Sequence, residues 1–504
     1  MQHTIITRNS SKIDNSEIDN IVNSLGVTVK EKVVELTDKL KETLDFSTIE
    51  KEISEMFNEF SAAILEKMLN EIIQNPQFLS FLKKLGGRLG MHFVRYREIN
   101  VRLYNGITVK VMSPYFVKAR PKKRKKKRKK SGPCGPNGYG HLGLSALGFI
   151  GFSSANITSE IVKLAVLCPS LQVAKDVLSE RGIEIDIKTI RRLCRDLSLI
   201  GLKFRGSVSI DGTENTTGHT LVIGIDGGRF RERRIKRGRK RKGQKRQGYY
   251  TEWKEPKLFT IWLSDNEGNK VRDFKPLYDA TTDGPDDMFL LLQRYLDALD
   301  LSGIAKAVFC GDGAPWIWNR VEKMCRNFKN LNSDRIFQVI DYTHAKQNLN
   351  EIISQIPKNC KKKDKIEKQW KKLLWEGNID GIYLEICKIL KGKKKKVGIN
   401  KWRNYFHKNK KRMQYQHFRS NHILCGSGCV ESAIRRVINL RIKSAGSFWK
   451  KERAEYFLFL RSQLLSGRWL IFIRNAARRW AKRIINNNTI APSKIISEKN
   501  IVSV

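Results

Sequence analysis

The chain of 504 residues lacks the features of membrane, secreted and low-complexity proteins. It has no apolar run near the ~18 residues of a membrane span, and its N-terminus lacks the apolar core of a secretory signal. Its nine cysteines include no Cys-x-x-Cys pair, so a disulfide framework is not expected. Only 12 prolines and 36 glycines are present, too few for a disordered low-complexity chain. We expect a folded, cytoplasmic protein of several domains.

Acidic residues are scarce relative to basic ones. Fifty aspartates and glutamates stand against 97 lysines and arginines, which gives a formal net charge of +47. A charge of this size predicts a polyanionic partner, because basic side chains that neutralise phosphates release condensed counterions. Charge alone leaves DNA, RNA and the ribosome open as partners.

The first third of the chain divides by charge and hydrophobic spacing. Residues 1–117 predict an N-terminal helical region, because 14–59 are rich in acids and carry apolar residues at helical spacing. A basic Gly/Pro linker follows over 118–156, and eleven of its first thirteen residues are lysine or arginine. This basic block is either a solvated tail or a non-specific contact with phosphates.

Three short amphipathic segments over 157–204 predict a helix-turn-helix DNA-binding domain. The first ends before Pro169, the second ends at Gly182, and the third begins after Asp186 as its N-cap. The third segment has an apolar face and an opposite basic face, the pattern of a recognition helix. Three such helices also occur in proteins that do not bind DNA. The basic face carries Lys188, Arg191, Arg192 and Arg195.

Strand-like and helix-like segments alternate from about residue 206. Apolar, β-branched runs at 219–230, 257–265 and 270–280 predict an antiparallel meander, and later apolar runs at 305–313 and 335–341 predict parallel strands joined through a helix. This order is that of a ribonuclease-H-like fold. We predict the α/β class, with a ribonuclease-H-like mixed sheet core over 206–345, an all-α insertion over 346–425, C-terminal core helices over 426–482 and a tail over 483–504.

Three acidic residues mark the ends of elements in this predicted core. Asp226 and Asp312 each end an apolar strand, and Glu431 follows a Gly-Ser-Gly turn at the start of a helix. Carboxylates gathered at one sheet edge repel unless cations neutralise them, and two Mg²⁺ ions held in this way serve phosphodiester displacement. Each acid alone has a simpler interpretation, because Asp-Gly is a common turn dipeptide and Glu431 could pair with Arg435.

Three longer segments carry a resemblance. AVFCGDGAPWIWN (307–319), VIDYTHAKQNL (339–349) and GSGCVESAIRRVINLRIKSAGSFW (426–449) resemble the hallmark blocks of bacterial insertion-sequence DDE transposases, particularly the Kra-type and Lre-type groups. The resemblance covers about residues 140–470. It implies a ribonuclease-H-like catalytic core in which three acids bind two Mg²⁺ ions, or Mn²⁺ in their place.

The resemblance also assigns residues. Asp312 matches the second acid of the triad and Glu431 the third. The first acid is Asp226 or Asp211, since both precede a glycine and follow an apolar run; we prefer Asp226, whose strand is longer and more apolar. Asp341 and His344 match a secondary motif, and we expect them to support the metal site or the substrate phosphate.

Basic side chains close to these acids are the expected DNA contacts. Residues 229–246 directly follow Asp226 and include twelve basic residues among eighteen, so this loop either clamps a phosphate backbone or is a solvated hairpin tip. On the helix of Glu431, the phosphate candidates are Arg435, Arg436, Arg441 and Lys443.

These features together predict a DNA transposase. We expect it to bind the terminal inverted repeats of an insertion sequence and target DNA, to cleave and join strands through the acidic triad, and to act as a homodimer or higher oligomer associated with the nucleoid. Two alternatives remain open at this stage. One is a non-catalytic, sequence-specific DNA-binding protein, and the other is a metal-dependent nuclease that only hydrolyses.

Overall fold

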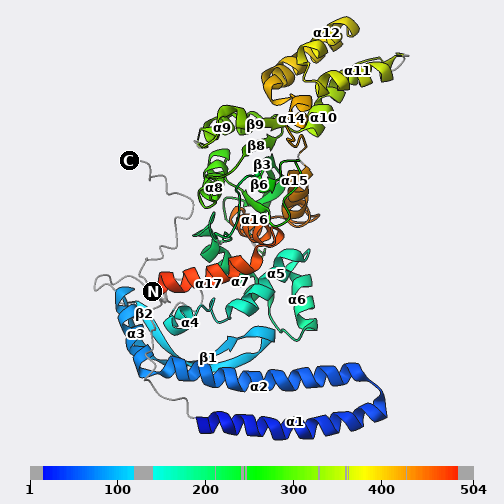
Figure 1. Ribbon diagram of the computed structural model, residues 1–504. Helices are drawn as coiled ribbons and strands as arrows, with labels where there is room; N and C mark the ends of the chain where they lie inside the picture. Colours follow the sequence, from blue (N-terminus) through cyan, green and yellow to red (C-terminus); the bar gives the residue numbers. More distant parts are fainter. Residues whose placement is uncertain are drawn as a thin grey trace. The chain divides into compact units, whose positions relative to one another are not determined.

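The structure, a computed structural model, describes residues 15–118, 140–210, 212–239, 243–244, 247–326, 328, 330–357, 360, 362–426 and 428–485 (Figure 1). These residues form two compact units, one that ends at Lys203 and resumes at Ile473, and one that spans Phe204–Phe472. Most of the basic linker, Asp211, part of the 229–246 segment and nearly all of the predicted C-terminal tail lie outside the described residues. No described helix combines the length and hydropathy needed to cross a membrane.

The first unit begins with helices α1 (Asn15–Thr43), α2 (Phe46–Gln74) and α3 (Pro76–Arg88). An antiparallel hairpin of β1 (Met91–Arg102) and β2 (Thr108–Lys118) follows, with the short helix η1 (Tyr104–Gly106) at its turn. The prediction of a helical region is therefore wrong for residues 91–117. In β2, Val109, Val111 and Ser113 are buried and alternate with exposed residues, which is the period of a strand with one covered face.

Short helices occupy the segment of the predicted helix-turn-helix domain. After α4 (Leu142–Ala146) come α5 (Ala155–Leu167), α6 (Leu171–Glu180) and α7 (Ile187–Leu202). Ser154, Ser170 and Asp186 cap them, because each side chain accepts a hydrogen bond from a backbone N–H three residues later. On α7, Lys188, Arg191 and Arg195 are exposed and Arg192 is half-buried.

A five-stranded mixed sheet forms the centre of the second unit, in the order β7-β6-β3-β8-β9. β3 (Thr220–Gly227), β6 (Lys257–Ser264) and β7 (Leu277–Thr281) form an antiparallel meander. β8 (Lys306–Gly311) and β9 (Ile336–Ile340) run parallel to β3 and are connected through α9 (Pro315–Cys325). The mixed α/β architecture predicted for this region is confirmed, although the third strand is shorter than the 270–280 run.

Helices cover both faces of this sheet. α8 (Pro285–Asp297) packs on β6 and β7, and α15 (Gly428–Ala433) packs on β3 and β6 from the opposite side (Figure 1). α15 continues into the π-helix η5 (Ile434–Asn439), followed by α16 (Lys451–Leu465) and α17 (Trp469–Ile485). Every residue of β6 is buried, because neither face of this strand meets solvent.

A buried ion-pair network fastens the outer strand β7. Arg205 donates two 2.8 Å hydrogen bonds to the two oxygens of Asp279, which is completely buried, and also pairs with Glu455 of α16. Glu455 in turn accepts hydrogen bonds from the backbone and hydroxyl of Thr282. Because a buried charge without its partner is costly, this network ties β7 and α16 together.

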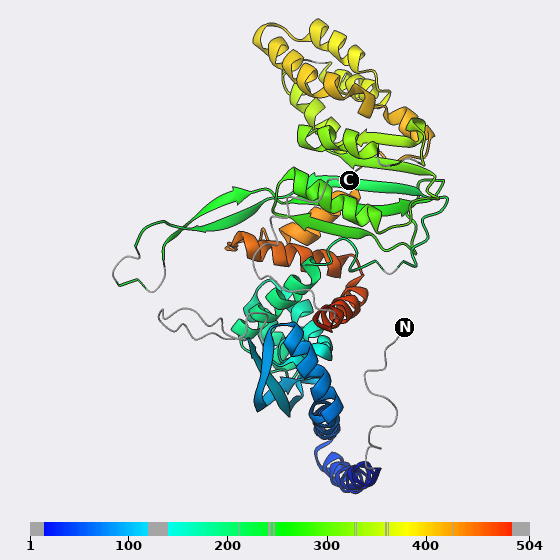
Figure 2. The same ribbon diagram turned by 90° about the vertical axis from the view of Figure 1, so that its left-hand side faces the viewer.

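Two insertions interrupt the sheet. Between β3 and β6, strands β4 (Phe230–Ile235) and β5 (Tyr249–Lys254) form a separate antiparallel ribbon that extends from the sheet (Figure 2). The loop prediction for 229–246 is therefore wrong for residues 230–235.

After β9, the described chain as far as residue 420 is helical where it is regular, as predicted. The helices are α10 (Tyr342–Ile353), α11 (Lys363–Trp375), α12 (Ile379–Ile389), α13 (Gly392–Lys401), the π-helix η3 (Trp402–His407), the short η4 (Lys410–Arg412) and α14 (Tyr415–Ser420).

Candidate metal centre

Three aspartates stand at the same level at the ends of the three parallel strands. Ile225 of β3 pairs with Gly311 of β8, and Gly311 pairs with Ile340 of β9. The residue after each of these is an aspartate. Because parallel strands have their carboxyl ends at the same edge of a sheet, the three aspartates lie at that edge. The three residues are Asp226, Asp312 and Asp341.

Glu431 reaches this edge from the helix that covers the sheet. It lies in the first turn of α15, directly after Val430, which packs against Gly224 of β3. A Cβ atom added to Gly224 would lie 3.1 Å from Val430 Cβ and 2.9 Å from Thr260 Oγ1, closer than ordinary contact. The absence of a side chain at Gly224 therefore lets α15 approach β3 two residues before Asp226.

Asp341 is completely buried and caps helix α10. Its side chain accepts hydrogen bonds from the backbone N–H groups of Thr343 (3.1 Å) and His344 (3.3 Å). Its Oδ2 also lies 2.8 Å from His344 Nδ1. This carboxylate raises the pKa of His344 above its ordinary value, more than burial of the ring lowers it.

Electrostatic coupling joins these groups into one cluster. One ligand atom each of Asp341, His344 and Glu431 lies within 4.8 Å of the other two. The pKa of Asp226 rises from 3.8 to about 6, chiefly through burial and further through the negative charges of Asp312 and Glu431. A 2.6 Å hydrogen bond from the Gly227 N–H and the charge of His344 act in the opposite direction.

The donor set suits a hard divalent cation. Two carboxylates and one imidazole lie within ligand distance, and Asp226 and Asp312 interact with them electrostatically. Carboxylates near one another are stabilised by protonation or by a cation. Carboxylate oxygens are the preferred ligands of Mg²⁺ and Mn²⁺. Burial is the main cause of the raised pKa of Asp226, and repulsion by Asp312 and Glu431 adds to it.

The group that the structure places within ligand distance differs from the predicted triad, because it contains Glu431 but neither Asp226 nor Asp312. Asp226, Asp312 and Glu431 are close enough for their charges to interact. The group already within ligand distance, however, contains Asp341 and His344, to which the sequence assigned only a supporting role. The sequence carried the signal for Asp341, since it follows an apolar strand as the other two aspartates do.

Tyr405 is a member of the site that sequence reasoning missed. It lies in η3, inside the helical insertion, and its ring packs against Gly313, the neighbour of Asp312. Its hydroxyl is buried, and burial followed by the charges of Asp312 and Asp341 raises its pKa. π-Helices often occur at functional sites, but the local sequence at 402–407 has no pattern that predicts one.

Arginines and lysines beside the centre differ in their accessibility. Arg435 and Lys443 are exposed, and Arg436 is half-buried and donates a hydrogen bond to the Tyr278 hydroxyl at 3.0 Å. Arg441 is only 4% exposed, and its guanidinium stacks over the rings of Trp449 (5.1 Å) and Phe457 (5.2 Å). Arg441 therefore serves packing and offers little surface to DNA.

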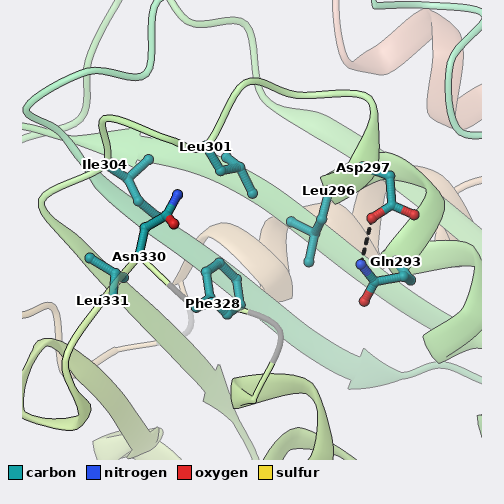
Figure 3. A pocket seen from close by; sticks show the side chains of 8 residues that line it. All are labelled: Gln293, Leu296, Asp297, Leu301, Ile304, Phe328, Asn330 and Leu331. Carbon is teal, nitrogen blue, oxygen red and sulfur yellow. Dashed lines mark hydrogen bonds between the residues drawn. The ribbon is translucent and has the colours of Figure 1, made fainter.

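A cavity of about 260 Å³ lies at the opposite end of β8 (Figure 3). Leu296, Leu301, Ile304 and Phe328 are among its lining, and Gln293 is hydrogen-bonded to Asp297 at its rim. Ile304 precedes the start of β8, whereas Asp312 follows its end. The cavity is therefore separate from the acidic cluster.

The fold and the site together define a class: a mixed α/β protein with a carboxylate-rich candidate metal centre at the carboxyl edge of its parallel strands. The chain belongs to the uncharacterised protein family UPF0236, whose model matches residues 150–478. No curated protein and no solved structure matches the chain.

Proposed function

We propose that the protein is a DNA transposase of the DDE type, which cleaves the ends of an insertion sequence and joins them to target DNA. The observation that carries this proposal is the group of Asp341, His344 and Glu431, which is electrostatically coupled to Asp226 and Asp312 in a chain of net charge +47. Carboxylates that hold divalent cations next to basic surfaces suit chemistry on a phosphodiester.

The strand order supports the same conclusion. An antiparallel meander of β3, β6 and β7, followed by β8 and β9 parallel to β3, is the arrangement expected of a ribonuclease-H-like core. In open α/β sheets, ligands bind beyond the carboxyl ends of the strands where the strand order reverses. β3 is such a point, since an antiparallel neighbour lies on one side and a parallel neighbour on the other.

The residues of the centre have distinct tasks in this proposal. Asp226, Asp312 and Glu431 would hold two Mg²⁺ ions, which when bound activate the attacking oxygen and stabilise the leaving one. Asp341 would hold His344 in place through the 2.8 Å contact between Oδ2 and Nδ1, and its negative charge raises the pKa of the imidazole. No covalent protein intermediate is needed.

DNA contacts are assigned to exposed basic groups. The basic face of α7 carries Lys188, Arg191 and Arg195 on a helix capped by Asp186, which fits the recognition helix of a helix-turn-helix domain. Arg435 and Lys443 are exposed on the chain that follows Glu431 and are assigned to phosphates. Association with the nucleoid and oligomerisation on DNA follow from the proposed function.

The test is a cleavage and strand-transfer assay with the purified full chain, Mg²⁺ and labelled element ends. We expect cleavage followed by joined product. Glu431→Gln and Asp312→Asn should abolish cleavage and leave binding of the ends intact, because an amide keeps the shape of the side chain and removes its charge.

Asp364→Asn serves as the matched control, since this exposed aspartate lies in the helical insertion. It should cleave and join as the unaltered protein does. Cleavage without any joined product would indicate a nuclease. Binding without cleavage would indicate a non-catalytic DNA-binding protein, and normal cleavage by Glu431→Gln would refute the assignment of the site.

A further inference from the structure

The β4–β5 ribbon has two faces of different chemistry. Its register pairs Arg231 with Trp253, Arg233 with Thr251 and Ile235 with Tyr249, and residues directly opposite each other in an antiparallel pair share a face. We call this set of six residues the aromatic face. It contains two arginines and two aromatic rings and has no acidic residue.

The opposite face neutralises its own charge. Glu232 and Glu252 are paired across the two strands. Arg234 Nε lies 3.3 Å from Glu232 Oε2 and 3.2 Å from Glu252 Oε2, and Lys254 Nζ lies 2.9 Å from Glu252 Oε1. The positive charge available to an outside partner is therefore concentrated on the aromatic face.

Large apolar rings are exposed on the aromatic face. Trp253 is 56% exposed and Tyr249 41%, and Phe448 lies 6.1 Å from the Tyr249 ring and is itself 38% exposed. The guanidinium of Arg231 is 4.6 Å from the Phe448 ring, and that of Arg233 is 4.0 Å from the Tyr249 ring. Guanidinium groups and flat rings thus alternate along one surface.

The ribbon leaves the sheet next to Asp226 and is hydrogen-bonded to the chain that follows the Glu431 helix. β4 begins shortly after Asp226, at the end of β3. The chain that follows the Glu431 helix runs beside β4, where Trp449 accepts a hydrogen bond from the Arg233 N–H (2.7 Å) and donates one to the Arg231 carbonyl (3.0 Å). A strand bound to the aromatic face would leave it toward the proposed metal centre.

We propose that the aromatic face, together with the neighbouring Phe448 ring, binds single-stranded DNA, with bases stacked on Trp253, Tyr249 and Phe448 and phosphates held by Arg231 and Arg233. Rings stack on bases only where those bases are free of the duplex, so paired DNA would engage the arginines and leave the rings without partners. The inference rests on the proposed function in one respect: the single strand bound in the cell would be the unpaired strand at a cleaved end of the element. Its test needs no catalysis.

The experiment measures the affinity of the full chain for oligothymidine of about 16 nucleotides, and for a duplex of equal length, by fluorescence anisotropy in EDTA over a range of salt concentrations. Trp253→Ala and Tyr249→Ala should each weaken single-strand binding about fivefold to a hundredfold. Duplex affinity should change far less. Trp253→Phe should restore most of the loss, because it restores a ring.

The salt dependence separates stacking from charge. Trp253→Ala should lower affinity at every salt concentration without changing the slope of log K against log salt, whereas Arg231→Gln should reduce the magnitude of that slope by about 0.7. Tyr250→Ala is the matched control, since Tyr250 is 49% exposed on the same strand and faces the other way. It should bind oligothymidine as the unaltered protein does.

Three results would overturn the inference: equal losses for single strands and duplexes, an equal loss in Tyr250→Ala, or unchanged DNA affinity in Trp253→Ala together with a smaller oligomer in light scattering. The last result would assign the aromatic face to a second copy of the chain. Failure of the cleavage assay together with the expected binding pattern would reject the transposase and retain the single-strand site.

Discussion

Replacing Asp226 with asparagine is expected to stabilise the metal-free protein while abolishing its proposed activity. The pKa of Asp226 rises from 3.8 to about 6 in the folded chain, chiefly through burial. A shift of this size means that the ionised carboxylate lowers the free energy of unfolding by about 3 kcal/mol. Asparagine has nearly the same shape without the charge, so Asp226→Asn should recover most of that amount at pH 8.

The pH dependence has a definite sign. Between pH 3.8 and 6 the folded chain holds the Asp226 proton that the unfolded chain has lost, so stability falls as pH rises through this window. The advantage of Asp226→Asn should therefore be greatest above pH 6, about half as large near pH 5, and absent below pH 3.8.

Denaturant unfolding followed by tryptophan fluorescence in EDTA measures this effect. Nine of the ten tryptophans lie within residues 204–472, so the signal reports the unit that contains the site. Adding Mg²⁺ should stabilise the unaltered chain more than the variant, and Asp364→Asn should match the unaltered chain throughout. A variant equally or less stable at pH 8 in EDTA would refute this account of the crowded carboxylates.

Three further predictions concern other residues. Gly224→Ala places a methyl group against Val430 and should cost about 1–3 kcal/mol and slow DNA cleavage, whereas Gly87→Ala, at an open helical position, should do neither; equal cleavage rates would contradict the close approach of α15. Tyr405→Phe keeps the ring on Gly313 and removes only the buried hydroxyl, which interacts electrostatically with Asp312 and Asp341, so we expect an unchanged Tm and a cleavage rate about tenfold lower; an unchanged rate would exclude a role for the hydroxyl. Burial and the charge of Arg97 lower the pKa of His141 to about 4, so the first unit should lose up to about 3 kcal/mol as pH falls from 6.5 toward 4; hydrogen exchange in peptides of that unit should show this loss, and His141→Phe should lack the pH dependence.

Much of the core could be predicted because its signals are local. The β-branched runs before Asp226 and Asp312 are buried on both faces, and such strands produce continuous apolar sequence. The N-cap of α7 at Asp186 could be predicted for the same reason, since a capping side chain bonds a backbone N–H within three residues. The choice between Asp226 and Asp211 remains a prediction, because Asp211 lies outside the described residues.

The errors arose where distant partners decide the outcome. The 229–246 segment looked like a charged loop because twelve of its residues are basic, yet pairing with β5 and with Trp449 makes residues 230–235 a strand. Arg441 was predicted to contact phosphate because it lies in the basic segment that follows Glu431. It is buried because the rings of Trp449 and Phe457 fold over it.

The amino-acid sequence alone determined most of the candidate residues, because carboxylates after buried strands and an excess of lysine and arginine are visible without coordinates. Only the tertiary structure decided which of these residues meet. The parallel register of β3, β8 and β9 places Asp341 beside Asp226 and Asp312, and the bare backbone at Gly224 admits the helix of Glu431. Proximity between residues more than a hundred positions apart depends on packing, which no local pattern encodes.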